Sequence, residues 1–370
     1  MEKDLVYLVT GGCGFIGEWI VKLLLKEDYV KEVRIFDLNE SEAIKHLDTA
    51  YTAVTFVKGD ITEFSQILSA VEGVDVVIHT AALVDYLDVF PFKKLEAINV
   101  GGTENVINAC LVKDVPYLVY TSSIAAVGPN INNDPLVRVT EDTLYPGEPS
   151  LSYGRTKAQA EKLTRLANGQ QTKNGKKLIT CVIRPSNVYG DKTPNLLSLY
   201  KSAKSKYNRL NYIEPDENEH SLTYVGNIAW MHVLAAQQMQ LHPDRLGGQV
   251  YYTYDDTPFK HRVKLHHDLF TEMDPDIEIG EHVPYWKMWI IVFIYSLIKV
   301  IVRPVWNVKP FMTLPVLKLM TISYSHDTDK AFRDFGYKPL FTWVESKQRT
   351  CQWLKQATQQ QGNEDRNVNC

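Results

Sequence analysis

The sequence has little cysteine and no long uninterrupted apolar run. The chain of 370 residues holds five cysteines without the spacing of a metal site or a disulfide framework, namely Cys13, Cys110, Cys181, Cys351 and Cys370. This usage is typical of a reducing compartment, and we expect no metal site. The charged start Glu2-Lys3-Asp4 leads directly into an apolar strand pattern, so we expect no signal peptide and a globular part in the cytosol.

Excess charge of one sign and internal repeats are also absent. The formal net charge is -4, and no basic patch indicates a nucleic-acid partner. Hydrophobic residues make up 45% of the chain and aromatic residues 11%. This composition suits one large α/β domain with a smaller appended part.

A glycine-rich turn follows the first apolar run. Leu5–Val9 is short and rich in branched residues, which is typical of a buried parallel strand, and TGGCGFIG at 10–17 follows it. In a dinucleotide-binding turn, Gly11 permits the tight bend, Gly14 lets the backbone approach a pyrophosphate, and Gly17 allows the helix to pack closely on the strand. The pattern therefore predicts a phosphate-binding turn at a helix N-terminus.

An acidic residue ends the next predicted strand, Val33–Phe36. Asp37 lies about 20 residues after Gly17, which is the position where a carboxylate accepts hydrogen bonds from the adenosine ribose and repels a 2′-phosphate. The spacing favours NAD over NADP. The alternative is a glycine-rich surface turn followed by an ordinary loop aspartate.

Strand and helix patterns alternate through the first half of the chain. Further strands are predicted at Thr55–Lys58, Val74–His79, Tyr117–Tyr120 and Leu178–Ile183, with helices around Phe64–Val71 and Leu95–Cys110. The alternation predicts an α/β fold with a Rossmann-type doubly wound parallel sheet, whose ligands bind at the carboxyl ends of the strands. The polar, proline-bearing stretch 130–149 is expected to be a loop that covers this site.

A tyrosine and a lysine four residues apart follow the fifth predicted strand. Tyr153 and Lys157 lie on one face of a predicted helix, where the ammonium can lower the phenol's pKa from its free value of about 10. Ser123 follows a central strand and flanks the same crevice. The order predicts a hydride transfer in which Tyr153 removes a hydroxyl proton, Ser123 hydrogen-bonds that oxygen, and Lys157 holds the nicotinamide ribose. The alternative is a surface Tyr and Lys together with serines that cap a turn.

Together these motifs resemble the extended short-chain dehydrogenase/reductase family. The resemblance rests on TGGCGFIG, Asp37, HTAA at 79–82, NVGGT at 99–103, TSS at 121–123, YGRTK at 153–157 and RPSNVYG at 184–190. Longer blocks resemble the 3β-hydroxysteroid dehydrogenase/Δ5-Δ4 isomerases over nearly the whole chain. They are YTSSIAAVGPN, YVGNIAWMHVLAA, GGQVYYTYDDTP and FGYKPLFTW. The first predicted strand of the chain, together with the block YVGNIAWMHVLAA, favours the type 7 branch of this family, which oxidises 7α-hydroxylated sterols.

The resemblance implies roles for individual residues. Tyr153 becomes the proton acceptor, Lys157 an NAD contact and Ser123 their partner. The residues expected around the dinucleotide are Gly11, Gly14, Phe15, Ile16, Gly17, Asp37, Asp60, Ile61, Ala81, Asn99, Lys157, Pro185 and Asn187. For the isomerase step the family points to the region of Tyr251 and Asp255, where a carboxylate moves a proton and a phenol stabilises the dienolate.

The chain also departs from the family pattern. Thr156 replaces a common serine, and Leu222 stands just before the YVGN block where relatives tend to carry arginine. On residues alone, YYTYDDTP at 251–258 also fits a strand that ends in an aspartate-rich turn.

The segment Trp286–Val302 is the most apolar part of the chain. Met288–Ile298 carries no charge, and Lys287 and Lys299 bracket it. A helix over the segment measures roughly 24 Å, which favours membrane insertion or monotopic anchoring over a full span; the alternative is a buried helix of the substrate-binding part. By resemblance, we expect attachment to the endoplasmic reticulum membrane with the catalytic domain facing the cytosol.

The motifs and the family resemblance thus predict an NAD-dependent enzyme that oxidises the 3β-hydroxyl of a Δ5-steroid or sterol to the 3-ketone. Isomerisation from Δ5 to Δ4 is expected to follow, in steroid hormone or bile acid synthesis. The alternatives are a nucleotide-sugar epimerase or reductase, and a non-catalytic NAD-binding regulator. A homodimer is left open. The expected parts are a Rossmann domain at 1–190, a substrate-binding part at 191–280, a membrane-associated segment at 281–320, a return to the core at 321–355 and a disordered tail at 356–370.

Overall fold

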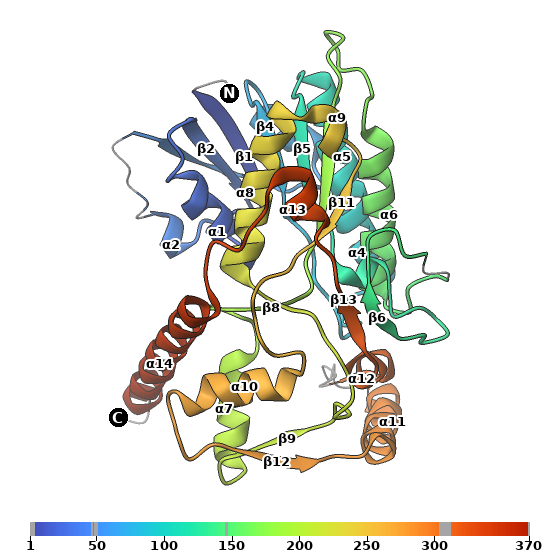
Figure 1. Cartoon of the computed structure of the whole chain (residues 1–370), viewed down its shortest axis with the longest axis vertical. Coiled ribbons are helices and arrows are strands. Elements are labelled where there is room, and N and C mark those ends of the chain that lie inside the picture. Colours follow the sequence, from blue (N-terminus) through green and yellow to red (C-terminus); the bar gives the residue numbers. More distant parts are fainter. Residues whose placement is uncertain (1–3, 46, 48–50, 145–146, 303–311, 369–370) are drawn as a thin grey trace.

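A sheet of parallel strands forms the upper half of the molecule (Figure 1). Its strands are β1 Leu5–Thr10, β2 Val30–Asp37, β3 Ala53–Lys58, β4 Val76–His79, β5 Tyr117–Thr121, β7 Ile179–Arg184 and β11 Val250–Tyr252. They lie in the order β11-β7-β5-β4-β1-β2-β3, and every pair is parallel. This computed structural model describes the chain except for residues 1–3, 46, 48–50, 145–146, 303–311 and 369–370. The expected doubly wound sheet is confirmed.

Helices cover both faces of this sheet. The helices α1 Phe15–Leu24 and α8 Val225–Leu241 pack on one face, whereas α3 Phe64–Ala70, α5 Gly102–Val112 and α6 Ser152–Ala167 pack on the other. Successive residues of a strand point to opposite faces, so Tyr7 and Val9 join the core beneath α1 and α8 while Leu8 joins the core beneath α3 and α5. The continuous apolar run of β1 is therefore buried on both sides.

The chain reverses its direction of travel across the sheet beside β1. It runs outward from β1 through β2 to β3, and then returns to β4 on the other side of β1. Thr10 and His79 end these two central strands in register, and the Thr10 Oγ1 lies 2.6 Å from the His79 Nδ1. In such sheets the ligand crevice opens at this reversal, outside the carboxyl ends of the strands.

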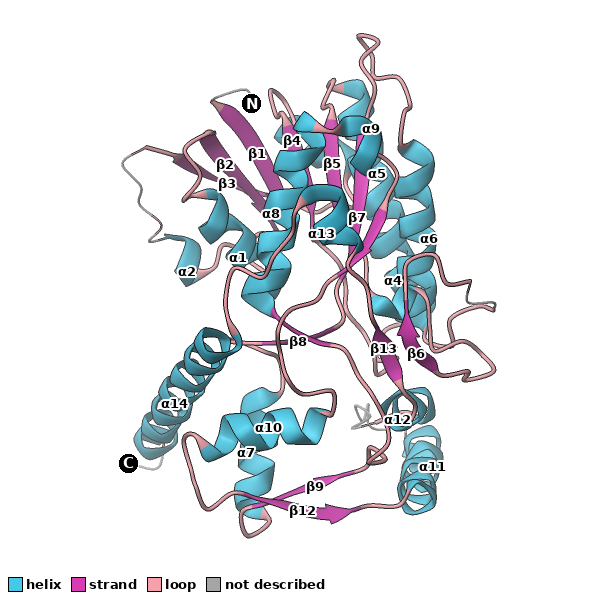
Figure 2. Ribbon diagram, in the orientation of Figure 1, coloured by secondary structure: helices cyan, strands magenta, loops and turns pink. Residues whose placement is uncertain are grey.

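The lower half of the molecule contains further helices and one pair of short strands (Figure 2). It contains α7 Leu196–Ser205, β9 Arg209–Tyr212, α10 Arg262–Thr271, β12 Glu278–His282, α11 Tyr285–Val302 and α12 Leu314–Thr321. Small parallel pairs link the halves: β8 Asn187–Tyr189 with β10 Leu222–Tyr224, and β6 Leu136–Val139 with β13 Tyr324–His326. The remaining elements are α2 Glu42–Lys45, α4 Phe92–Glu96, a π-helix Ala97–Gly101, a 3₁₀-helix Ile124–Ala126, α9 Pro243–Leu246, α13 Lys330–Phe335 and α14 Trp343–Val368.

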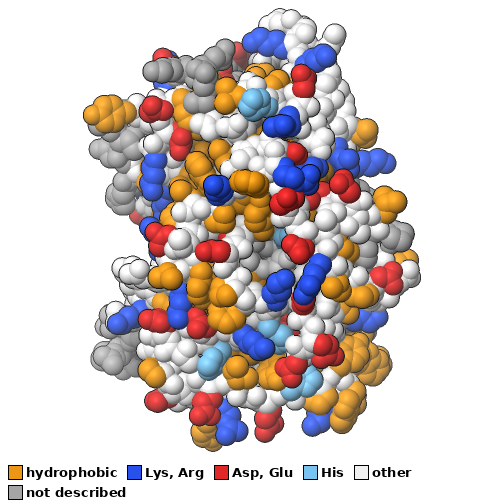
Figure 3. All heavy atoms as spheres, in the orientation of Figure 1, with side chains coloured by type: hydrophobic (Ala, Val, Ile, Leu, Met, Phe, Trp, Pro, Cys, Tyr) orange, Lys and Arg blue, Asp and Glu red, His pale blue; other side chains and the backbone are white. Residues whose placement is uncertain are grey.

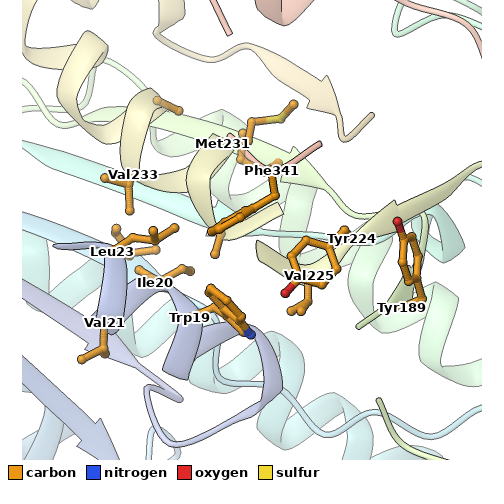
Figure 4. Packing of buried hydrophobic residues seen from close by; sticks show 14 of the residues in the cluster. Trp19, Ile20, Val21, Leu23, Tyr189, Tyr224, Val225, Met231, Val233 and Phe341 are labelled. Atoms are coloured by element: carbon orange, nitrogen blue, oxygen red, sulfur yellow. The ribbon is translucent and has the colours of Figure 1, made fainter. Parts of the chain in front are cut away.

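The chain returns to the large sheet within the predicted substrate-binding part at 191–280, before the predicted return to the core at 321–355. Helix α8 packs against α1, and β11 forms the edge of the sheet beside β7. Figure 4 shows Val225, Met231 and Val233 of α8 in one cluster with Trp19, Ile20 and Leu23 of α1. The Trp19 ring also meets the rings of Tyr224 and Phe341 edge-on, at centroid distances of 5.8 and 5.5 Å. The stretch from α8 to β11 is thus part of the Rossmann layer and not of a separate substrate-binding part, because its apolar side chains complete that core.

Two expected irregular regions contain regular structure. The predicted loop at 130–149 includes strand β6, which pairs with β13 from the far end of the chain. The predicted disordered tail is instead the continuation of α14, which runs to Val368. Pairing with a strand almost two hundred residues away has no local signal, as the 187-residue separation of Arg138 and Ser325 illustrates.

The apolar segment is a helix, α11, as expected. Among the residues that the structure describes, no helix combines the length and the apolar character that crossing a membrane requires. Helix α12 packs beside α11.

We expect Gly17→Ala to destabilise the cofactor-free protein by about 1–3 kcal/mol. A Cβ atom on Gly17 would lie 2.1 Å from the carbonyl oxygen of Gly11, which is backbone and cannot swing aside. Gly101→Ala is the matched control, because a Cβ there meets nothing within 4 Å. Urea unfolding of both variants tests this, and equal midpoints for the two variants would refute the packing argument.

Candidate active site

Tyr153, Lys157 and Ser123 converge at the carboxyl end of β5. Tyr153 and Lys157 lie one turn apart in α6, and Ser123 caps the 3₁₀-helix that follows β5. All three side chains are buried. The Ser123 Oγ also accepts a hydrogen bond from the Ala125 N–H at 3.1 Å, which fixes its rotamer. The structure therefore brings the predicted trio together.

The ammonium of Lys157 is held against strand β5. Its Nζ donates to the carbonyl oxygen of Thr121 at 2.6 Å and lies 4.3 Å from the centroid of the Tyr120 ring. Burial lowers the pKa of Lys157 to about 7, and the Glu161 carboxylate opposes that shift. Near neutral pH this lysine therefore changes charge easily.

Tyr153 is buried beside another tyrosine. Its ring centroid lies 5.2 Å from that of Tyr86, with the ring planes inclined by 56°. Burial raises the pKa of Tyr153, the nearby Tyr86 raises it further, and the neighbouring Ser123 lowers it. An ionised Tyr153 therefore depends on positive charge and hydrogen-bond donors brought close to its oxygen.

Glu161 attaches the catalytic helix to the sheet. Its carboxylate accepts a hydrogen bond from the Ser122 Oγ at 2.7 Å and pairs with the Arg184 guanidinium at 2.5 Å. Ser122 follows β5, and Arg184 ends β7. Sequence reasoning missed both Glu161 and Arg184, although Glu161 lies one further turn along the same face as Tyr153 and Lys157.

The glycine turn has the geometry of an anion-binding helix start. Gly11 has a φ of +68°, which only glycine adopts easily, and a Cβ there would lie 2.7 Å from the Ala81 nitrogen. The Gly11 carbonyl accepts from the Gly14 N–H at 2.9 Å, and Gly14 is the N-cap of α1. Phe15 and Ile16 open the helix and pack against the core.

The acidic residues at the ends of β2 and β3 lie in fixed positions. The Asp37 Oδ2 accepts from the Cys13 N–H at 3.0 Å, which ties it to the glycine turn. The Asp60 Oδ1 accepts from the Thr62 N–H at 2.9 Å. Ile61 is buried against Gly102 at the start of α5, where a Cβ would lie 2.5 Å from the Ile61 Cδ1.

Asn99 connects the strand-end loop to the catalytic helix. Its Oδ1 accepts from the Leu83 N–H at 2.7 Å, and its Nδ2 donates to the Leu83 carbonyl at 3.0 Å and to the Thr156 Oγ1 at 3.0 Å. The Thr156 hydroxyl donates in turn to the carbonyl of Tyr153. The threonine that replaces the family's common serine therefore still takes part in this network.

Pro185 and Asn187 border the crevice from the side of β7 and β8. The Pro185 carbonyl accepts from the Ile124 N–H at 2.9 Å, next to Ser123. The Asn187 Nδ2 donates to the Ser221 carbonyl at 3.1 Å, and Asn187 pairs in register with Leu222. Leu222, the other departure from the family pattern, is buried in strand β10.

The chain matches a known protein family over most of its length. The model of the 3-beta hydroxysteroid dehydrogenase/isomerase family matches residues 8–280. The chain belongs to this family. Family membership confirms the expected class of enzyme, an oxidoreductase and isomerase of 3β-hydroxysteroids with NAD as its cofactor.

Curated relatives match almost end to end. The 3 beta-hydroxysteroid dehydrogenase type 7 of Mus musculus is 40% identical over 354 residues, which cover 95% of this chain and 96% of the relative. The type 7 protein of Homo sapiens is 38% identical, with coverage of 96% and 97%. The 3 beta-hydroxysteroid dehydrogenase/Delta 5-->4-isomerase of Vaccinia virus (strain Western Reserve) is 34% identical, with coverage of 95% and 99%.

Solved structures share the fold at low identity. MoeE5 in complex with UDP-glucose and NAD superposes with a TM-score of 0.69 at 18% identity and covers 95% of this chain and 99% of its own. The epimerase Mth375 of Methanothermobacter thermautotrophicus gives 0.70 at 21% identity, with coverage of 96% and 94%. These likenesses support the fold of this 3β-hydroxysteroid dehydrogenase/isomerase family member and say nothing about its substrate.

The crevice fits the dinucleotide that the family uses. The Gly11 turn leaves no room for a side chain next to Ala81, and Gly14 presents the first N–H groups of α1. Asp37 lies at the end of β2 with its carboxylate beside this turn. These residues suit a pyrophosphate on the helix and an adenosine ribose at Asp37.

The structure does not bring Tyr251 and Asp255 to Tyr153. On β11, Val250 packs toward Ala160 of α6, so its neighbour Tyr251 points to the opposite face and donates to the Asp334 Oδ2 at 3.0 Å. The buried Asp255 accepts from the Tyr224 N–H at 2.8 Å, at the start of α8. These contacts favour structural roles for both residues, and their part in the isomerase step stays a prediction.

The buried Lys157 predicts a pH dependence of stability for the cofactor-free protein. Folded Lys157 loses its proton near pH 7, whereas the unfolded chain keeps it up to about 10.5, so between these values the unfolded state binds one more proton. The free energy of unfolding is therefore expected to gain a rising contribution as pH increases from 7 toward 10. Lys157→Met lacks this contribution. Urea unfolding across that range tests it, and parallel curves for the two proteins would contradict a lowered pKa.

Proposed function

We propose that this chain oxidises the 3β-hydroxyl of a Δ5-sterol to the 3-ketone, with Tyr153 as the base. The observation that carries the proposal is the buried meeting of Tyr153, Lys157 and Ser123 at the carboxyl end of β5, next to a dinucleotide-binding turn. Bound NAD supplies the acceptor for the hydride at C3. The Tyr153 oxygen takes the hydroxyl proton, and Ser123 hydrogen-bonds the substrate oxygen.

Lys157 supports the base electrostatically. Burial raises the pKa of Tyr153, so the ionised phenol needs compensation by a nearby cation. Lys157 lies one turn further along the helix and is the cation of this face. We also propose that it holds the nicotinamide ribose, and that Gly11, Gly14, Gly17, Asp37 and Asp60 hold the rest of the dinucleotide.

The proposed substrate is a sterol of the type 7 class. The mammalian type 7 relatives are 36–40% identical to this chain, and the viral dehydrogenase/isomerase is 34% identical. A nucleotide-sugar substrate has only the fold in its favour, at 18–21% identity. The family name supports a subsequent shift of the double bond from Δ5 to Δ4.

We further propose that helix α11 attaches the enzyme to the endoplasmic reticulum membrane, with the catalytic part on the cytosolic side. Its apolar side chains form the α11 apolar surface, each exposed by 38–75%: Trp286, Trp289, Ile290, Ile291, Phe293, Ile294, Leu297, Ile298 and Ile301. In Figure 3 hydrophobic side chains gather at the lower right, where α11 lies. Such a patch is unfavourable in water and suits the apolar side of a lipid interface.

The path from α11 to the active site is short along the chain. Helix α12 leads into β13, and the Tyr324 hydroxyl of β13 donates to the Ile124 carbonyl at 2.5 Å. Ile124 follows Ser123 directly, so the membrane-facing helices connect to the segment that carries the catalytic serine.

Tyr153→Phe is expected to lower kcat for sterol oxidation by at least about 100-fold, because the phenol's proton transfer is lost. NADH formation with 7α-hydroxycholesterol and with pregnenolone measures it. Conversion of UDP-glucose to its 4-epimer tests the alternative epimerase, which regenerates its NAD in each turnover. NAD binding by the variant, followed by fluorescence, controls for folding. Undiminished turnover by Tyr153→Phe, or epimerisation of UDP-glucose without oxidation of either sterol, would overturn the proposal.

The membrane proposal has its own test. The double substitution Ile290→Glu/Ile294→Glu places two carboxylates on the α11 apolar surface and should weaken flotation with phosphatidylcholine vesicles by about tenfold or more. Leu166→Glu/Leu241→Glu is the matched control, since these leucines are exposed to a similar degree, 62% and 45%, on other helices. Equal flotation of the two variants would exclude α11 as the attachment surface.

A further inference from the structure

A buried carboxylate lies in the first turn of the helix that begins at the glycine turn. Glu18 follows Gly17 directly in α1, is 6% exposed, and its N–H donates to the Gly14 carbonyl at 2.9 Å. Residues four apart lie on one face of a helix, so Glu18 is one turn from Gly14 on the same face. The N–H groups at this helix start are those that suit a pyrophosphate. An uncompensated carboxylate beside them would therefore repel the diphosphate of a dinucleotide.

Two ammonium groups compensate this carboxylate. The Lys192 Nζ donates to both oxygens of Glu18, each at 2.7 Å, and the Lys22 Nζ donates to the Glu18 Oε1 at 2.6 Å. Burial raises the pKa of Glu18, but the hydrogen bonds from Lys192 and Lys22 outweigh this effect and hold the pKa below its ordinary value. Glu18 is therefore ionised near neutral pH, and the three groups together carry one net positive charge.

Lys192 comes from the loop that follows β8, on the other side of the crevice from α1. Pro185 and Asn187, which are expected beside the nicotinamide, precede it in the chain. Lys192 and Glu18 are 174 residues apart, so their contact joins this side of the crevice to the glycine turn. Lys22, by contrast, lies on α1 itself, four residues after Glu18, and can pair with it within the helix. Lys192 is thus the compensating charge that only the folded crevice supplies.

The loop after β8 holds Lys192 in a set position. Gly190 has a φ of +139°, and a Cβ atom on it would lie 2.6 Å from the Val225 Cγ1, so the backbone runs directly against the start of α8. The Asp191 Oδ1 accepts from the Tyr224 hydroxyl at 2.9 Å. Because the two residues before Lys192 are held in this way, little further backbone freedom is lost when its ammonium pairs with Glu18.

We propose that Lys192 is a positioning residue for the dinucleotide: its ammonium neutralises Glu18, so that the start of α1 presents net positive charge to the diphosphate. The same ion pair fixes the loop after β8 beside the crevice. The inference rests on the dinucleotide site proposed above, with the pyrophosphate at Gly14 and the first turn of α1.

The test is the affinity for NAD of two single variants and their combination, measured by fluorescence titration of the full chain. Lys192→Met removes the net positive charge and is expected to weaken NAD binding about fivefold. Glu18→Gln adds one net positive charge and is expected to tighten NAD binding about fivefold. The double variant Glu18→Gln/Lys192→Met keeps the Lys22 ammonium and the wild-type net charge, so it should bind NAD within about twofold of the wild type.

Lys204→Met is the matched control, because the Lys204 side chain is exposed to a similar degree as that of Lys192, 42% and 46%, and pairs with Asp274 in the lower half of the molecule. Its affinity for NAD should equal that of the wild type. Unchanged NAD binding by Lys192→Met would overturn the inference. A double variant as weak as Lys192→Met would do so too, because the loop would then act through its attachment and not through charge. These results refute this inference alone, whereas a wild-type protein that binds no NAD removes the dinucleotide site itself.

Discussion

The buried pair of Glu161 and Arg184 is the interaction on which the active site depends. Through it and through Ser122, helix α6 is attached to the carboxyl ends of β5 and β7. Removing one member of such a pair typically costs about 3–5 kcal/mol, because the other charge stays buried without a partner. The pair therefore favours the orientation of α6 in which Glu161 faces the sheet. In this orientation Tyr153 and Lys157, on the same face of the helix, also point toward the sheet.

Burial changes the pKa values of the two ionisable groups of the site and makes their charged forms less stable. The same desolvation that lowers the pKa of Lys157 to about 7 raises the pKa of Tyr153. Both shifts oppose the charged pair that the oxidation needs, so the site relies on fixed donors around the phenol. The side-chain amide of Asn99 hydrogen-bonds both the loop after β4 and helix α6, and so holds the groups around the phenol in place.

The halves of the molecule are joined by contacts between residues far apart in the chain. Trp19 near the glycine turn packs on Phe341, and the Asn227 Oδ1 accepts from the Phe341 N–H at 2.8 Å. Tyr324 reaches Ile124 beside Ser123. The C-terminal part of the chain thus contacts α1 and α8 through Phe341, and the segment beside Ser123 through Tyr324.

The sequence by itself determined the parallel sheet, the glycine turn with Asp37 at its expected place, and the trio of Ser123, Tyr153 and Lys157. These features have local periods or short fixed spacings, which a linear pattern carries. Only the tertiary structure decided that α8 and β11 join the large sheet, that β6 pairs with β13, that Tyr251 faces away from Tyr153, and that Tyr86 lies against it. Each of these depends on contacts between distant segments, and on the strand face that a residue occupies, which burial across the whole fold selects.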